Sequence, residues 1–107
     1  MEPTPRTVKY YRNANLKSPF ERWLSGMDGD VRAAVRTRLR RIEVQGNYGD
    51  CEPVGDGVYE LRIHKGPGYR VYLGIDGDAV IVLGGGRKDT QSSDINQSKE
   101  HWSDYNA

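Results

Sequence analysis

Two neighbouring segments in the second half of the sequence carry charged or phenolic residues at every second position. The segments are Val58–His64 and Tyr69–Ile75, and apolar residues fill the positions between, as in β-strands with one polar and one apolar face. The polar positions hold Glu60, Arg62, His64, Arg70 and Tyr72. Guanidinium groups bind phosphate oxygens, and a carboxylate or an imidazole can transfer protons. These residue types therefore suit phosphate binding and acid/base chemistry, and they make a nucleic acid or a nucleotide the first ligand hypothesis.

The sequence between the two segments predicts a β-hairpin. Gly66–Gly68 is a turn sequence, and hairpin pairing sets the polar faces of the two strands beside each other. Structural interpretations remain open for these residues. Arg62 and Glu60 can form a cross-strand ion pair on a solvated face, a contact worth only about 0.2–1 kcal/mol. His64 can be a plain surface residue at a strand end, and Tyr72 can simply cover a sheet edge.

The first half of the sequence predicts one strand and two helices that position this patch. Thr7–Arg12 is rich in β-branched and aromatic residues, which favours a strand. Ser18–Glu21 has the pattern of a capping box with proline at the first helical position, so a short helix should follow and end at Gly26. A longer helix, capped by Asp28 or Asp30, comes next. The apolar positions at helical spacing in the two helices are Phe20, Trp23, Leu24, Val31, Ala34, Val35, Leu39 and Ile42.

The second half predicts the remainder of a small sheet. Gly46–Asp50 breaks the second helix and starts the sheet region. Asp76-Gly77 is a two-residue hairpin signal before Ala79–Leu83, an apolar run that fits a central strand buried on both faces. Gly84–Gly86 ends this strand. We interpret these glycines as structural, because they lack the spacing of a phosphate-binding loop.

A polar helix is expected to follow the last strand. It should run from about Gln91 to Ser103, with Ile95 and Trp102 as its contacts. The resulting order is β-α-α-β-β-β-α, without repeats or linkers. We therefore expect a single small α+β domain over residues 1–107.

Composition limits the classes of function. The formal net charge is only +1, so a nucleic-acid function must depend on local placement of charge. Of the 16 Lys and Arg residues, 11 are Arg, whose planar fork fits phosphate. A single cysteine, Cys51, excludes an internal disulfide or a Cys-based zinc site and favours the reducing cytoplasm. Neither Met1–Pro5 nor any later apolar run indicates a signal peptide or a membrane span.

Two further basic features have both a functional and a structural interpretation. The second helix carries Arg32, Arg36 and Arg40 at every fourth position, with Arg38 and Arg41 nearby. A solvated face is the commoner case for such a stripe, and a surface for ribosomal RNA or a protein partner is the alternative. Lys88 follows three glycines and precedes a helix, where a backbone nest can help to bind an anion. It can equally be a loop charge.

Several motifs, in order and correctly spaced, resemble those of a known family. They are Gly46–Asp50, Gly55–Arg62, Gly66–Tyr72 and Gly85–Gln91 with Asp94-Ile95. On these motifs the chain resembles the addiction-module killer proteins, which are HigB-like toxins of the RelE/ParE superfamily and are also found as phage-derived, Gp49-like proteins. The resemblance extends from the helix with Phe20–Leu24 to the final helix.

The resemblance implies a fold and an activity. The fold is a compact RelE/ParE-like one, a twisted antiparallel sheet with two N-terminal helices packed on one side and a C-terminal helix. RelE-type relatives cleave mRNA in the ribosomal A site without a metal. The chain is therefore expected to be the toxin of a type II toxin–antitoxin system, an endoribonuclease (mRNA interferase) without a cofactor. One alternative is a ParE-like toxin that poisons gyrase without nuclease activity. Another is an inert, phage-derived binding module on the same fold.

The resemblance also assigns roles to single residues. Arg62, Arg70 and Lys88 match basic residues of the relatives and are expected to stabilise the phosphorane formed when an RNA 2′-hydroxyl attacks the adjacent phosphorus. Glu60 or His64 is expected to transfer protons, although RelE proper has a basic residue where this chain has Glu60. The candidate substrate-binding residues are Tyr72, Arg87 and Gln91. The expected partners are mRNA, the ribosome and a helix-turn-helix antitoxin, which leaves a toxin–antitoxin hetero-oligomer open, and no membrane partner is expected.

Overall fold

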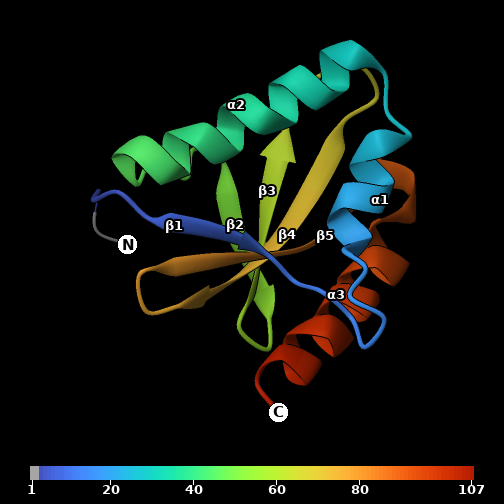
Figure 1. The fold of residues 1–107 in the computed structure, drawn as a ribbon. Coiled ribbons are helices and arrows are strands. Elements are labelled where there is room, and N and C mark those ends of the chain that lie inside the picture. Colours follow the sequence, from blue (N-terminus) through green and yellow to red (C-terminus); the bar gives the residue numbers. More distant parts are fainter. Residues whose placement is uncertain (1–2) are drawn as a thin grey trace.

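A computed structural model describes residues 3–107, which form a five-stranded sheet with helices on both faces (Figure 1). The strands are β1 (Thr7–Tyr10), β2 (Cys51–Gly55), β3 (Val58–Ile63), β4 (Tyr69–Asp76) and β5 (Ala79–Arg87). The helices are α1 (Pro19–Ser25), α2 (Gly29–Gln45), the short 3₁₀ turn η1 (Lys88–Thr90) and α3 (Gln91–Tyr105). Met1 and Glu2, part of the N-terminal stretch without an apolar run, lie outside the described residues. None of the described helices is both long and apolar enough to cross a membrane.

The strand order across the sheet is β1-β5-β4-β3-β2. The hairpins β3–β4 and β4–β5 are antiparallel, as the turn sequences predict, and the α+β fold class is confirmed. One pairing differs from the expected antiparallel sheet, because β1 runs parallel to β5 with Thr7 beside Ala79. These two strands are far apart in the sequence, and such a long connection allows parallel pairing, whereas a tight turn would not. The sheet is therefore mixed.

The presence of β2 and the end of β1 also differ from the sequence-based expectation. Strand β2 is absent from the expected order, because Pro53 in its centre is a signal against a strand. Its place at the edge of the sheet explains why proline is tolerated there. Strand β1 ends at Tyr10, two residues before Arg12, although the Tyr11 amide still donates to the Val82 carbonyl at 2.9 Å.

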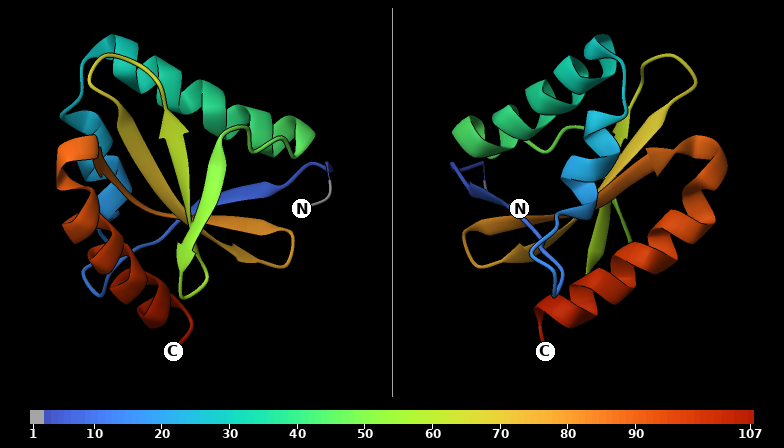
Figure 2. Two further views of the ribbon diagram at one scale, coloured as in Figure 1. Left: turned by 180° about the vertical axis from the view of Figure 1, so that it is seen from behind. Right: turned by 45° about the vertical axis from the view of Figure 1, so that its right-hand side comes forward.

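The two faces of the sheet are covered by different helices, and Figure 2 shows α2 and α3 on opposite sides of the strands. On one face, the expected apolar positions of α1 and α2 pack against alternate residues of β3, β4 and β5. On the other, α3 packs through Ile95 and Trp102, as predicted, and the Trp102 ring lies directly over Gly74. The polar positions of β3 and β4 belong to this second face. Of these positions, Glu60, Arg70 and Tyr72 are buried, whereas Arg62 is partly exposed and His64 is largely exposed.

Local signals at the helix ends behave largely as the sequence predicts. The Ser18 hydroxyl accepts a hydrogen bond from the Glu21 amide at 3.1 Å and caps α1. Asp28 is the N-cap residue of α2, although its side chain makes no capping hydrogen bond. Helix α2 ends at Gly46, whose φ of 65° and close approach to Thr4 both require glycine.

The glycine tract Gly84–Gly86 brings two helices close to β5. A Cβ atom at Gly85 would overlap the ring of Trp23 in α1, and one at Gly86 would overlap the Asp94 carboxylate in α3. The structural interpretation of the tract is therefore confirmed. The expectation that it ends the strand is wrong, because β5 continues to Arg87 with these glycines paired to β4, where the close approach of the helices requires residues without side chains. The glycines set how closely α1 and α3 approach the strand that precedes η1.

Candidate active site

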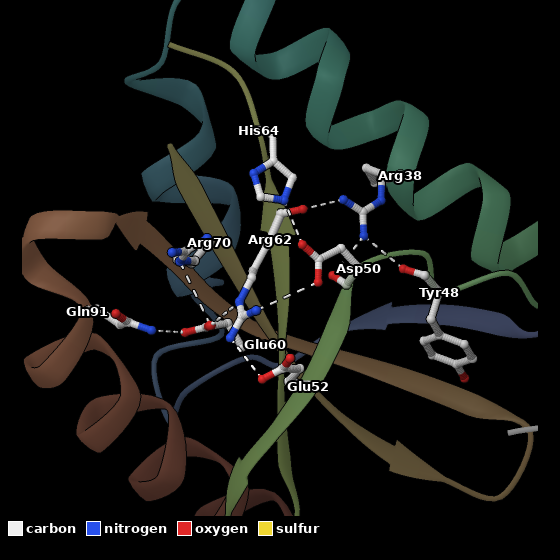
Figure 3. A network of polar contacts seen from close by, with 9 residues as sticks. All are labelled: Arg38, Tyr48, Asp50, Glu52, Glu60, Arg62, His64, Arg70 and Gln91. Atoms are coloured by element: carbon white, nitrogen blue, oxygen red, sulfur yellow. Dashed lines mark hydrogen bonds and ion pairs between the residues drawn. The ribbon is translucent and has the colours of Figure 1, made fainter. Parts of the chain in front are cut away.

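Glu60 is the buried centre of a polar cluster between β3 and α3 (Figure 3). Its side chain is only 1% exposed. One carboxylate oxygen accepts a hydrogen bond from Gln91 Nε2 at 2.7 Å, and the other accepts one from Arg62 Nε at 3.3 Å. The Nε atom of Arg70 lies 3.8 Å from that second oxygen. Because a charge is stable in the interior only when it is paired, Glu60 depends on these three side chains.

Arg62 extends from the buried carboxylate toward solvent and contacts three acidic groups. Besides Glu60, its Nη2 atom donates to Glu52 at 2.9 Å, and its Nη1 atom lies 3.9 Å from Asp50. The hydrogen bond to Glu60, followed by these charges, raises the pKa of Arg62. The expected ion pair with Glu60 exists, but it joins neighbours on one strand. The cross-strand partner of Arg62 is Glu52 on β2, and Glu60 is buried rather than solvated.

Arg70 and Tyr72 are also buried, which corrects the expectation of a solvated face. The Arg70 side chain is 10% exposed, and Tyr72 is fully buried beneath the residues of α3. Tyr72 does not cover a sheet edge, because β4 lies between β3 and β5. Its hydroxyl has no hydrogen-bond partner within residues 3–107. Burial, followed by the negative charge of Glu60, raises the pKa of this hydroxyl.

His64 stands at the exposed rim of the cluster and pairs with Asp50. Its Nε2 atom lies 2.6 Å from an Asp50 carboxylate oxygen, and the ring is 72% exposed. This hydrogen bond, with the nearby charge of Arg62, lowers the pKa of Asp50. An ionised carboxylate only accepts hydrogen bonds, so this contact assigns the proton to Nε2. The other ring nitrogen, Nδ1, is then free to exchange a proton with a ligand.

Arg38 holds the backbone that carries this rim. Its guanidinium donates to the carbonyl oxygens of Arg62, of Tyr48 at 2.8 Å and of Asp50 at 3.1 Å. Burial lowers the pKa of Arg38. Arg38 therefore does not belong to the solvated arginine stripe expected on α2. The sequence contained a signal for this, because position 38 lies three residues after buried Val35 and so on the inward side of the helix.

Two of the predicted basic residues lie apart from the cluster. Lys88 is exposed on η1, and its side chain forms no hydrogen bond or ion pair with Glu60, Arg62 or Arg70. Arg87 bonds to Asp89 at 2.6 Å. These residues, together with Pro67, line a separate hollow of about 440 Å³. Figure 3 shows Glu60, Arg62, Arg70, His64 and Gln91 together, and Tyr72 lies opposite Glu60 on β4. Within residues 3–107, no hydrogen bond or ion pair links the side chain of Lys88 or Arg87 to this group.

Asp50 and Glu52 are the site residues that the sequence-based prediction missed, because β2 was not expected. In the β2–β3 register Glu52 lies opposite Glu60, and the Arg62 amide donates to the Asp50 carbonyl. With these two residues included, three carboxylates surround two arginines. The cluster therefore has a formal charge of −1 when His64 is neutral. Within residues 3–107, no group of three or more His, Cys, Asp or Glu side chains is arranged to hold a metal ion.

Comparison with known proteins shows the family to which this small α+β protein belongs. Residues 22–100 match the model of a family described as "Phage derived protein Gp49-like (DUF891)". The chain belongs to this family, which is one of RelE/ParE-like toxins. A protein of Haemophilus influenzae, described as uncharacterized, is 46% identical over 82 residues, which are 75% of this chain and 82% of that relative.

Proposed function

We propose that this protein is the HigB-like toxin of a type II toxin–antitoxin pair and inhibits translation by cleaving mRNA on the ribosome without a metal. The observation that carries the proposal is the arrangement around Glu60, in which a buried carboxylate bonds to Arg62 and lies 3.8 Å from Arg70, with an exposed histidine at the rim. Membership in a family of RelE/ParE-like toxins supports the toxin assignment.

The proposed reaction is an internal transfer of the phosphoryl group. The RNA 2′-oxygen loses its proton and bonds to phosphorus, the bond to the 5′-oxygen breaks, and that oxygen takes up a proton. The products are a 2′,3′-cyclic phosphate and a free 5′-hydroxyl. We assign the proton transfer to Nδ1 of His64, because Glu60 is too deeply buried and too fully bonded to reach a substrate. Arg70 and Arg62 stabilise the charge on the phosphorane, and Glu60 positions them.

Replacing His64 with alanine is expected to lower cleavage by roughly 10²–10⁴-fold, the usual contribution of an acid or base catalyst. The fold should be unaffected, because the ring is largely exposed. Added imidazole should restore part of the activity, which a merely structural role of His64 does not predict. The matched control is His101→Ala, which removes the other histidine of the chain, on α3, where it stacks on Tyr11 at 4.8 Å. Equal activities of the two variants would rule out His64 as the proton-transfer group.

A ParE-like, gyrase-poisoning toxin is the second candidate, and one observation favours it. Arg62 already contacts Glu52 and Glu60, so the cluster offers no excess positive charge to an RNA phosphate. Such a toxin acts by binding and does not need a proton-transfer group near its arginines.

Expression without an antitoxin distinguishes the two candidates. We expect pulse-labelling to show that protein synthesis stops first, while DNA synthesis continues. The His64→Ala variant serves as the matched control, because it keeps the fold and loses the proposed chemistry. An early loss of DNA supercoiling with translation intact would instead support gyrase as the target.

We also propose that a helix-turn-helix antitoxin inhibits the protein in a toxin–antitoxin hetero-oligomer. The exposed arginines of α2 would attract an acidic segment of such a partner. This attraction would speed capture more than it would add to final affinity.

A further inference from the structure

A second hollow lies beside the charged cluster, between α2 and the end of β3. It has a volume of about 320 Å³. The residues that line it include Thr37, Arg41, His64 and Lys65. His64 thus borders both the hollow and, through Asp50, the cluster around Arg62. A ligand that occupies the hollow would meet the exposed imidazole at its edge.

The hollow contains the unpaired positive charge that the cluster lacks. The side chains of Arg41 and Lys65 are exposed, and neither forms an ion pair or a hydrogen bond within residues 3–107. Arg38, at the inner wall, is already bonded to three carbonyl groups. The charge of Arg41 is close enough to contribute, after burial, to the lowered pKa of Arg38. The carboxylate of Asp50 already pairs with His64 and Arg62.

We propose that this hollow binds a backbone phosphate of the RNA substrate, next to the phosphate that is cleaved. Arg41 and Lys65 neutralise the phosphate, and the Thr37 hydroxyl supplies a further hydrogen bond. The RNA strand then runs from the hollow across His64 toward Arg62 and Arg70. This inference rests on the proposed RNA-cleaving function and adds the groups that hold the substrate in place.

The size of the hollow suits a nucleotide phosphate. A volume of about 320 Å³ accommodates a phosphate and part of a nucleotide. The position next to an exposed imidazole also suits a substrate better than an inhibitor that acts at a distance. Binding of an acidic peptide is therefore an outcome that the test must separate from binding of RNA.

The test measures binding without cleavage. The probe is a short, single-stranded 2′-O-methyl RNA, which lacks the nucleophilic hydroxyl and remains intact. We expect Arg41→Ala and Lys65→Ala each to weaken binding several-fold at low salt. Each lost phosphate contact should also reduce the slope of log K against log salt concentration by about 0.7. The matched control is Arg36→Ala, an exposed arginine on the other flank of α2 beside Tyr10, which should bind the probe as the unaltered protein does.

Three results would overturn the inference: no binding of the probe by the unaltered protein, unchanged binding by both variants, or an equal loss in Arg36→Ala. Unchanged RNA binding together with weaker capture of an acidic peptide would identify the hollow as a protein-docking surface and would also reject the inference. The proposed function is judged separately by pulse-labelling. If Arg41→Ala and Lys65→Ala weaken binding but the unaltered protein leaves translation intact, the hollow binds RNA and the proposed cleavage is wrong.

Discussion

Replacing Arg70 with alanine is expected to lower cleavage of ribosome-bound mRNA by roughly 10²–10³-fold, the scale on which one electrostatic donor contributes to a transition state. Its guanidinium is nearly buried, where charges interact more strongly than in water. The same change removes a positive charge beside Glu60, so the alanine variant should also be less stable. On a solvated face, by contrast, such a substitution would cost no more than about 0.5 kcal/mol.

Arg70→Lys separates the two effects. Lysine keeps a positive charge next to Glu60 but lacks the planar fork that fits a phosphate with two hydrogen bonds. We expect this variant to stay folded and yet to cleave more slowly than the unaltered protein. The measurement is the cleavage rate divided by the folded fraction, which urea unfolding supplies. Full toxicity of a folded Arg70→Ala or Arg70→Lys protein would remove Arg70 from the mechanism.

The second large effect is expected in the stability of Glu60→Gln. This substitution keeps the shape of the side chain but leaves Arg70 without its acidic partner inside the protein. Breaking a buried pair in this way costs about 3–5 kcal/mol. The control is Glu52→Gln, which removes an exposed carboxylate from Arg62 and should cost about 0–1 kcal/mol.

Urea unfolding of the two glutamine variants gives both free energies under one set of conditions. A loss for Glu60→Gln that is as small as the loss for Glu52→Gln would mean that the interior cluster is not held together by charge pairing. The cluster would then be a weak scaffold for positioning the two arginines, and the proposed mechanism would lose its basis.

The parts of the site that could be predicted from the sequence are those set by local geometry. The two-residue period of a strand places Glu60, Arg62 and His64 on one face, and the hairpin brings Arg70 beside them. The same alternation, however, is typical of a solvated face. Nothing in it indicates that α3 covers this side of the sheet, because that depends on packing between distant segments.

The missed residues have more particular causes. Because Pro53 is a signal against a strand, β2 is not predicted, and the carboxylates of Asp50 and Glu52 beside Arg62 are missed with it. The charge of Arg38 predicts a place in the surface stripe, although its position on α2 faces inward. Its role depends on three carbonyl groups that only the folded chain brings together. The substrate-binding role of Gln91 stays a prediction, and the structure adds a bond from its amide to Glu60 that the sequence does not indicate.

The parallel pairing of β1 with β5 has a consequence for synthesis of the protein. Thr7 lies beside Ala79, so the first strand has no neighbour in the sheet until the last strand has left the ribosome. Glu60 must also wait for Gln91 on α3. Contacts between such distant segments form late and slowly. A partly translated chain therefore cannot complete the sheet or the charged cluster until Ala79–Arg87 and Gln91 have left the ribosome.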